Sequence, residues 1–551
     1  MFEKRDKSKK VKKITCSKCK EEILLDKKIE TDYICPICNN YLPFYSLDRI
    51  KSLADKNSFI EWDKELSFPY SSDEQEYVDK IKRTQETTNI QEAIITGEVL
   101  IEGCKCAIGV MDSSFMMASM GYVVGEKVTR LFERAGKKRL PVIIFCCSGG
   151  ARMQEGIISL MQMEKTVAAL RQHSEKGLLY ISVLTNPTMG GVTASFAMIA
   201  DIVFAEKGAQ IGFAGPRVIE QNMGEKLPKG FQTSEFQKER GFVDYIVNRE
   251  SLKENLARIL KLHLSPKSNF LKSRQCIGIK ASRISYVYKE NISAWDKMKL
   301  ARRISRPTSL EYIKHIFDEF YEFHGDRLGS EDSAIVAGIA RVGQISVTVV
   351  AEQKGKSSLE EAQFRNWGMP SPGGYRKALR LMKQAEKFNR PIICFVDTIG
   401  AACGRKAEEQ GQGVAIANLL DEMSKFSVPI LSIIIGEGGS GGALALAIGN
   451  EVWMFENSVY SILTPEGYAS IVWKDATRAK EAANMMKLSA EELFELGVID
   501  RIIPEVNPVT KNNLPEISIL VKQMIYGFLI KYRFRRKKSV IEERRRRFRK
   551  Y

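Results

Sequence analysis

Two glycine-rich turns follow apolar runs in the first half of the sequence, and both could bind a negative charge. The run Pro141–Cys147 ends at Ser148-Gly149-Gly150, and the run Tyr180–Leu184 leads to Gly190-Gly191. A short β-rich run that ends in glycines before a helix predicts a strand, a turn and a helix. Glycine lets backbone N–H groups approach a ligand, and helix N-termini leave such donors unpaired. We therefore expect the two turns to hold an oxyanion between them.

The same layout returns 250 residues later, with the second glycine turn slipped by one position. Five features match in the same order, which chance explains poorly, and they predict two copies of one domain. The matched pairs are Pro141–Cys146 with Pro391–Val396, Gly150-Ala151 with Gly400-Ala401, Gly190-Gly191 with Gly441-Gly442, Glu206 with Glu456, and Gly241–Asp244 with Gly497–Asp500.

Four of the eleven cysteines have the spacing of a metal site. Cys16 and Cys19 are separated by two residues, as are Cys35 and Cys38, and fifteen residues lie between the two pairs. This pattern predicts a zinc ribbon in which two tight turns supply four thiolates to one Zn²⁺ ion. Four cysteine ligands leave no open position, so we expect a structural rather than a catalytic ion. The other seven cysteines stand in apolar or ordinary contexts and are expected to be buried hydrophobes.

Side chains that usually act as bases or bind phosphate are missing near the turns. The four histidines (His173, His263, His315 and His324) fall outside every glycine turn, which argues against a histidine-based triad. The sequence also lacks the phosphate-binding motifs of nucleotide enzymes. Arg217 and Arg376 could bind a phosphate or carboxylate, and a salt bridge or a solvated helix face is the alternative for each. Chemistry here would depend on backbone donors, with the proton acceptor supplied by another molecule.

The composition indicates a globular protein with unusual ends. The 551 residues are 44% apolar and carry a net charge of +17. Residues 1–20 have a surplus of seven positive charges and residues 531–551 a surplus of ten, so the body between them is neutral. The basic ends could bind polyanions, and a solvated, partly helical tail is the alternative. We expect a cytoplasmic protein without a membrane segment, since the sequence contains no secretory signal and no membrane-length apolar run.

The remaining patterns indicate how the turns are positioned. Strand hairpins are expected at 97–110, turning at Gly103, and at 334–350, and amphipathic helices at 251–300. The expected segments are a zinc ribbon (1–45), a first domain (46–265), a linker (266–300), a second domain (301–525) and a basic tail (526–551).

The residues around the turns resemble a known enzyme family over nine-tenths of the chain. The segments Ser148–Glu155, Ser182–Val192 and Gly212–Gln221, with the zinc ribbon before them, resemble the β subunit of bacterial acetyl-CoA carboxylase carboxyltransferase. The segments Asn366–Met382 and Gly436–Ala445 resemble its α subunit. The chain is therefore similar to a fused β–α polypeptide of this family.

The resemblance implies an α/β fold with two tandem crotonase-like domains, each a ββα superhelix, and an active site where two halves meet. It implies that carboxybiotin on a carrier protein donates CO2, that the freed ureido nitrogen of biotin takes the α-proton of acetyl-CoA, and that the enolate attacks CO2 to form malonyl-CoA for fatty acid synthesis. N–H groups of Gly190 and Gly191 would stabilise the enolate, and those of Gly441 and Gly442 the ureido oxyanion. The expected substrate-binding residues are Gly149, Gly150, Arg217, Gly400 and Arg376.

The resemblance also implies partners: a biotin carboxyl carrier protein, biotin carboxylase and a second copy of the chain in a dimer. Two segments depart from the family pattern. Asp397–Gly404 lacks two prolines and a tyrosine that α subunits usually have, and Met117-Ala118 replace a glycine pair of β subunits. Two alternatives stay open: carboxylation of propionyl-CoA or another acyl-CoA, and a zinc-ribbon protein that binds nucleic acid.

Overall fold

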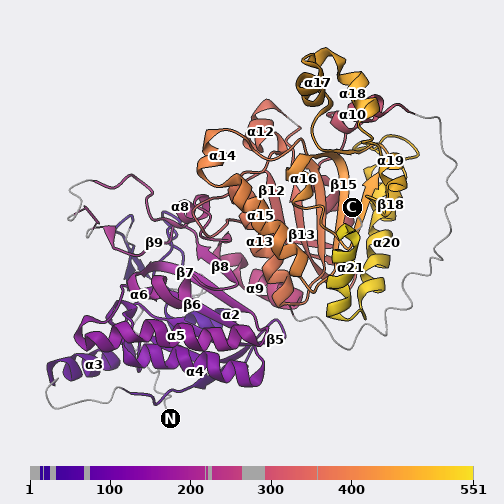
Figure 1. The fold of residues 1–551 in the computed structure, drawn as a ribbon. Coiled ribbons are helices and arrows are strands. Elements are labelled where there is room, and N and C mark those ends of the chain that lie inside the picture. Colours follow the sequence, from indigo (N-terminus) through magenta and orange to yellow (C-terminus); the bar gives the residue numbers. More distant parts are fainter. Residues whose placement is uncertain are drawn as a thin grey trace, which may run out of the picture. The chain divides into compact units, whose positions relative to one another are not determined.

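The computed structural model describes residues 13–16, 18–24, 33–67, 75–216, 219–220, 226–263, 292–356 and 358–549. These residues divide into two compact units (Figure 1). The first unit comprises Met1–Lys238 and Val243–Lys261, and the second comprises Glu239–Phe242 and Leu262–Tyr551. Each unit is described by itself. Within the described ranges, no helix combines the length and apolar content that a membrane crossing requires.

The first unit contains a mixed sheet with strand order β10-β8-β7-β6-β5-β4-β3, and β9 pairs with β7. Neighbours from β5 to β10 are parallel, whereas β3, β4 and β5 are antiparallel. The predicted hairpin at Gly103 is confirmed by β4 and β5. The strands are β3 (Ile60–Trp62), β4 (Ile94–Ile101), β5 (Cys104–Met111), β6 (Val142–Ser148), β7 (Tyr180–Met189), β8 (Ile202–Glu206), β9 (Ile211–Gly212) and β10 (Tyr245–Val247).

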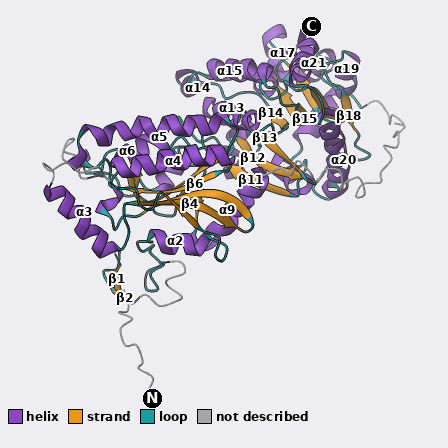
Figure 2. Ribbon diagram, turned by 90° about the horizontal axis from the view of Figure 1, so that it is seen from below, coloured by secondary structure: helices purple, strands orange, loops and turns teal. Residues whose placement is uncertain are grey.

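Helices cover both faces of this sheet because its central strands are apolar on both sides. α4 and α5 lie against each other on one face, and α2 packs on the other against β4 and β5 (Figure 2). α4 ends where Arg139 adopts the left-handed conformation (φ 55°), two residues before Pro141. The helices are α2 (Ser46–Leu53), α3 (Gln75–Thr88), α4 (Tyr122–Lys138), α5 (Ile157–Glu175), α6 (Gly190–Val192), α8 (Ser234–Glu239) and α9 (Arg249–His263).

The ribbon at the N-terminus is joined to the first unit through a buried arginine. It contains β1 (Lys13–Thr15) and β2 (Glu22–Leu24). Arg249 donates hydrogen bonds to the carbonyls of Tyr33 (2.8 Å) and Leu42 (2.9 Å) and pairs with Glu206. Arg49 pairs with the same carboxylate at 2.7 Å. The two guanidinium groups outweigh the effect of burial and lower the pKa of Glu206 to about 2.

The second unit repeats the topology strand for strand. Its order is β11-β12-β13-β14-β15-β16-β18, and β17 pairs with β15 as β9 pairs with β7. The hairpin predicted at 334–350 is confirmed by β12 and β13. The strands are β11 (Glu319–Phe323), β12 (Ile335–Val342), β13 (Ile345–Glu352), β14 (Ile392–Thr398), β15 (Ile430–Gly439), β16 (Glu451–Phe455), β17 (Val459–Ser461) and β18 (Arg501–Ile503).

One face of the second sheet packs on α11 and α20, whose apolar residues share a core with alternate residues of the strands. α13 packs on the sheet from its other side beside α15 (Figure 1). The helices are α10 (Ala294–Arg302), α11 (Ser309–Ile316), α12 (Leu359–Phe364), α13 (Pro372–Lys387), α14 (Arg405–Glu409), α15 (Gln412–Lys425), α16 (Ser440–Leu444), α17 (Pro465–Trp473), α18 (Ala479–Met485), α19 (Ala490–Glu495), α20 (Leu514–Tyr532) and α21 (Lys537–Arg549).

Two segments that the sequence analysis set apart from the domains, the linker and the basic tail, contain helices. Ala294–Arg302, expected within the linker, forms α10, while residues 264–291 lie outside the described residues. The expected basic tail includes the end of α20 and all of α21 as far as Arg549. Arg544 of α21 is buried and donates hydrogen bonds to the carbonyls of Met423, Phe426 and Val428. A part of the tail therefore packs on the second unit, because this arginine caps carbonyls at the end of α15.

Candidate active site

The two glycine turns of the first unit meet at the carboxyl ends of neighbouring strands. β6 and β7 are parallel, and Ser148 pairs with Thr188 at their ends. Gly190 has φ +61°, and a Cβ on it would lie 2.8 Å from the Cα of Gly150. Gly150 itself has φ +126°. Both positions therefore require glycine, one for its conformation and the other for its conformation and the close approach.

Several predicted N–H donors of this unit already have acceptors. Gly149 donates to the carbonyl of Met117 at 2.7 Å, Gly150 to Ser148 Oγ at 3.0 Å, and Gly190 to the carbonyl of Phe213 at 2.9 Å. Among the described residues, no acceptor receives the N–H of Gly191 or of Ala151. At least one N–H donor from each turn therefore remains available. Sequence reasoning missed Ala151, although its place directly after Gly150 was the signal for it.

The second unit has the same turns in the same geometry. Gly400 donates to Thr398 Oγ1 at 3.0 Å, as Gly150 does to Ser148, and Ala402 donates to the carbonyl of Pro370 as Arg152 does to that of Met120. Within the described part of the chain, the N–H groups of Ala401, Gly441 and Gly442 have no acceptor. The second unit therefore also leaves donors available on both turns.

The strand registers relate the two units by an offset of 250 residues at the ends of β6 and β7, and by 249 residues at β9. Thr188 pairs with Ser148 and Ile211, as Gly438 pairs with Thr398 and Tyr460. Ser440 then corresponds to Gly190, and both have a positive φ (56° and 61°). Gly441 thus corresponds to Gly191, so the slip of one position expected from the sequence is wrong. The reason is that Ser440 adopts a conformation for which the sequence suggested glycine.

Gly442 is held against the preceding turn. A Cβ at this position would lie 2.4 Å from the backbone nitrogen of Ala401 and 2.9 Å from the hydroxyl of Tyr375. A residue larger than glycine therefore does not fit at this position unless the backbone moves. Gly441 differs, because a Cβ there would have no atom within 4 Å.

Buried charges surround the second pair of turns. Lys354 Nζ lies 2.8 Å from Asp397 Oδ1 and 2.7 Å from Glu437 Oε2, and Arg302 pairs with Glu437 at 2.7 Å. The Lys354 ammonium counteracts burial and lowers the pKa of Asp397, while the two carboxylates raise the pKa of Lys354. Asp397 and Glu437 lie at the ends of β14 and β15, so this network fixes the strand ends from which both turns start.

The predicted arginines are placed differently. Arg376 donates to Asp326 Oδ2 at 2.8 Å and to the carbonyl of Gln410 at 3.3 Å. Arg217 lies outside the described residues. Arg152, which follows the first turn, is buried and pairs with Glu92 at 2.7 Å. The guanidinium of Arg376, which the sequence suggested as a ligand-binding group, is therefore paired with Asp326.

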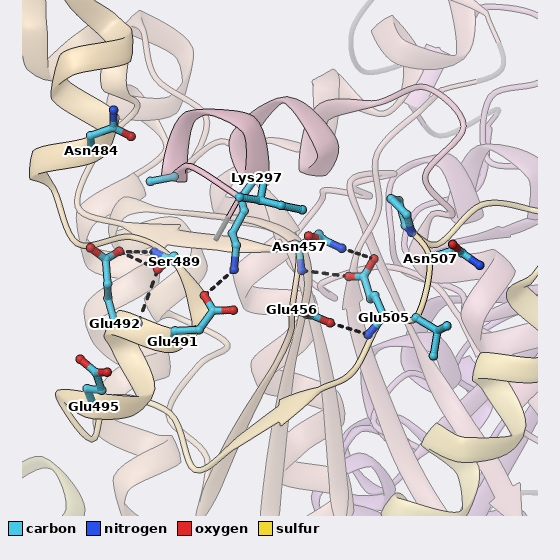
Figure 3. Close-up of a pocket in the computed structure, with 14 residues that line it drawn as sticks. Lys297, Glu456, Asn457, Asn484, Ser489, Glu491, Glu492, Glu495, Glu505 and Asn507 are labelled. Atoms are coloured by element: carbon cyan, nitrogen blue, oxygen red, sulfur yellow. Dashed lines mark hydrogen bonds and ion pairs between the residues drawn. The ribbon is translucent and has the colours of Figure 1, made fainter. Parts of the chain in front are cut away.

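Two pockets lie in the second unit. One, of about 320 Å³, is lined by Ser440 and Gly441 on the glycine turn and by Leu444, Tyr460 and Ile462. The other, of about 540 Å³, is acidic and contains no predicted site residue (Figure 3). Several of its acids already have partners: Glu491 pairs with Lys297, and Glu505 accepts from Asn457. The pocket beside Gly441 is therefore the one connected with the turns.

The four predicted cysteine ligands come together in the ribbon. Their sulfur atoms all lie within 4.8 Å of one another. Cys16 and Cys38 are separated by 3.6 Å, and Cys19 and Cys35 by 3.7 Å. A tetrahedral site with Zn–S bonds of about 2.3 Å separates its sulfurs by about 3.8 Å, which these distances fit. The four cysteines are therefore compatible with a structural metal site.

Comparisons with known proteins cover nearly the whole chain. The family described as acetyl co-enzyme A carboxylase carboxyltransferase-like matches residues 242–551. The acetyl-coenzyme A carboxylase carboxyl transferase subunits beta/alpha of Clostridium tetani are 52% identical over 92% of this chain and 87% of the relative. The protein of the same name from Natranaerobius thermophilus is 50% identical over 91% of this chain and 86% of the relative.

The fold is similar to that of a crystal structure of transcarboxylase 12S with methylmalonyl-coenzyme A and methylmalonic acid bound. The TM-score is 0.69 at 21% identity, over 89% of this chain and 90% of the other. A single-chain, multi-domain long-chain acyl-CoA carboxylase matches with a TM-score of 0.65 at 17% identity, over 87% of this chain and 45% of the other. The tandem α/β architecture is thus shared with carboxylase and transcarboxylase structures.

Proposed function

The chain belongs to the family of acetyl-CoA carboxylase carboxyltransferases, in the fused β/α form, and we propose that it carries out its reaction with backbone donors. It is a carboxyltransferase with two tandem crotonase-like domains. We propose that it transfers a carboxyl group from carboxybiotin to acetyl-CoA and forms malonyl-CoA. One observation supports this assignment most directly. The glycine turns of the two units are equivalent, and in each unit they leave N–H donors available.

In the first unit, we assign the enolate of the acetyl-CoA thioester to the N–H groups of Gly191 and Ala151. An enolate develops negative charge on the thioester oxygen, and preorganised N–H donors stabilise such charge at little cost of reorganisation. Gly149, Gly150 and Gly190 have a shaping role in this proposal, because their N–H groups hold the turns together.

In the second unit, we assign the ureido oxyanion of biotin to the N–H groups of Gly441, Gly442 and Ala401. Gly400 shapes this turn as Gly150 shapes the first. The pocket beside Gly441 supports the assignment, because Leu444 and Ile462 offer apolar surface to a small ring system. Arg376, which is paired with Asp326, is assigned to keeping α13 in place rather than to direct contact.

We propose that the proton of acetyl-CoA is not accepted by a histidine of this chain. His173 bonds to the carbonyl of Leu140, and His324 lies beside Glu331, so neither reaches a glycine turn. When bound, carboxybiotin supplies the carboxyl group and, once this has left, a ureido nitrogen that accepts the proton. The role of the chain is to orient both reactants and to stabilise the two oxyanions.

We propose the following partners: a biotin carboxyl carrier protein, biotin carboxylase, and a second copy of the chain. Exposed apolar side chains on α5 support self-association, with Ile157 64% exposed and Met161 51% exposed. We assign Zn²⁺ to the cysteine cluster, since four thiolates at these distances suit it. We also propose a cytoplasmic location, because the described cysteines are all free thiols.

The reverse reaction tests this function. Purified protein is given malonyl-CoA and biocytin, and the formation of acetyl-CoA is followed. We expect biotin-dependent turnover, and we expect Gly191→Val and Gly441→Val each to reduce kcat by about 10²–10³-fold by blocking an oxyanion site. Neither position has a positive φ. A Cβ on Gly441 would meet no atom within 4 Å, and one on Gly191 would first meet the flexible side chain of Met163 at 3.3 Å, so both variants are expected to fold.

Gly527→Val in α20 is the matched control, because a Cβ there also meets no atom within 4 Å. It should keep wild-type turnover. A folded wild-type protein without biotin-dependent turnover would refute the proposed function, and full activity of both turn variants would refute the assignment of the donors.

A further inference from the structure

Two buried polar side chains beside the glycine turns of the second unit have atoms without a hydrogen-bond partner among the described residues. Glu352, at the end of β13, and Tyr375, in the first turn of α13, are both fully buried. Among the described residues, Glu352 Oε1 and the Tyr375 hydroxyl have no hydrogen-bond partner. Burying such atoms costs about 1–3 kcal/mol each. Their presence therefore needs an explanation.

The fold itself does not require them, as the first unit shows. Met111 pairs with Ile94 at the end of β5, as Glu352 pairs with Ile335 at the end of β13. Gly125 is the fourth residue of α4, as Tyr375 is of α13. The first unit thus builds the same sheet and helix with a methionine and a glycine. Glu352 and Tyr375 therefore distinguish the glycine turns of the second unit from those of the first unit.

Both groups lie against the backbone of the glycine turns in the second unit. Glu352 Oε2 accepts the N–H of Asp397 at 3.1 Å, and Asp397 Oδ1 accepts the N–H of Glu437 at 3.0 Å. The chain of bonds thus links the ends of β13, β14 and β15. The Tyr375 hydroxyl lies 2.9 Å from the point where a Cβ on Gly442 would be, and the nitrogen of Ala401 lies 2.4 Å from the same point.

The carboxyl group is suited to this place in its neutral form. Burial, and then the nearby Asp397 carboxylate, raise the pKa of Glu352 well above its ordinary value. A neutral acid can accept the Asp397 N–H with one oxygen and donate from the other. It also adds no further negative charge beside a site that must hold an oxyanion.

We propose that Glu352 and Tyr375 are positioning residues for the biotin side of the reaction. Glu352 holds the ends of β14 and β15 in register, and the Tyr375 hydroxyl supports the contact between Gly442 and Ala401. Together they keep the N–H groups of Ala401, Gly441 and Gly442 directed at one point.

This inference rests on the proposed function, and the test separates the two. Glu352→Met introduces the residue of the first unit, Glu352→Gln keeps a neutral polar group, and Tyr375→Phe removes only the hydroxyl. In the reverse assay we expect Glu352→Met and Tyr375→Phe to raise the KM for biocytin or lower kcat at least tenfold, with the KM for malonyl-CoA unchanged. Glu352→Gln should restore most of the activity.

Hydrogen exchange gives a readout besides activity. Peptides covering 399–404 and 437–443 should exchange faster in Glu352→Met and Tyr375→Phe, while those covering 149–153 and 188–193 should not change. Met111→Leu in the first unit is the matched control. Wild-type turnover with unchanged biocytin kinetics and unchanged exchange in folded Glu352→Met would overturn the inference, as would equal effects on both substrates. An inactive wild-type protein would refute the proposed function instead, and the exchange pattern would still test the positioning.

Discussion

At the scale of single residues, the two units differ in the side chains that lie beside their glycine turns. The first unit has Met111 where the second has Glu352, and in the second unit Lys354 pairs with Asp397 and Glu437 at the ends of β14 and β15. Identical backbones therefore present different electrostatic surroundings. This difference suits two oxyanions of different chemistry, and it gives the second unit a titratable group that the first lacks.

Glu352 makes stability depend on pH in a direction that can be predicted. Its pKa is raised in the folded protein, so folding takes up a proton once the pH exceeds the ordinary glutamate value of about 4.3. The free energy of unfolding contributed by this group is fully present below that value and falls as pH rises toward the folded pKa. Urea unfolding at pH 5, 6, 7 and 8 should therefore show that the stability of Glu352→Gln relative to wild type rises with pH, by at most about 1.4 kcal/mol per pH unit.

Glu175→Gln is the control for this measurement, because the Glu175 side chain is 59% exposed and its ion pair with Arg171 lies at the surface. Its difference from wild type should stay constant with pH. A constant difference for Glu352→Gln would contradict the raised pKa.

At the scale of elements, the C-terminal helix α21 acts as a clamp on the second unit. Arg544 is 1% exposed and donates to three carbonyls at and beyond the end of α15 and to the side chain of Asn450 (2.7 Å). We expect Arg544→Leu to destabilise the protein by about 2–4 kcal/mol, because these oxygens would lose their buried donors. Thermal unfolding measures the effect. Arg545→Leu, one position further on an exposed part of the helix, should change the midpoint little, and equal effects of the two changes would contradict the clamp.

At the scale of the whole molecule, we expect the chain to associate. The exposed apolar side chains of α5 are Ile157, Ile158, Leu160 and Met161. Sedimentation equilibrium should give the mass of two 62.2 kDa chains, and the double change Ile157→Glu and Met161→Glu should give that of one, because apolar burial drives association. Arg171→Glu on the same helix should leave the mass unchanged. A wild-type protein that sediments and turns over as a single chain would exclude the dimer.

Local patterns in the sequence were sufficient for several parts of this protein. The cysteine pairs predict the ribbon because each tight turn is specified by neighbouring residues, and the structure brings all four sulfurs together. The hairpins at Gly103 and at 334–350 are local as well. The repeat follows from order along the chain, which needs no knowledge of contacts.

What the sequence by itself determined was thus the ribbon, the two copies and the glycine turns at strand ends, all of which depend on residues close together in the chain. Only the tertiary structure decided which N–H groups remain available, since the acceptors of Gly149 and Gly190 come from Met117 and Phe213. It alone placed Glu352 and Tyr375 beneath the second turn. The physical reason is that hydrogen-bond satisfaction and burial are set by distant segments, which a local pattern does not contain.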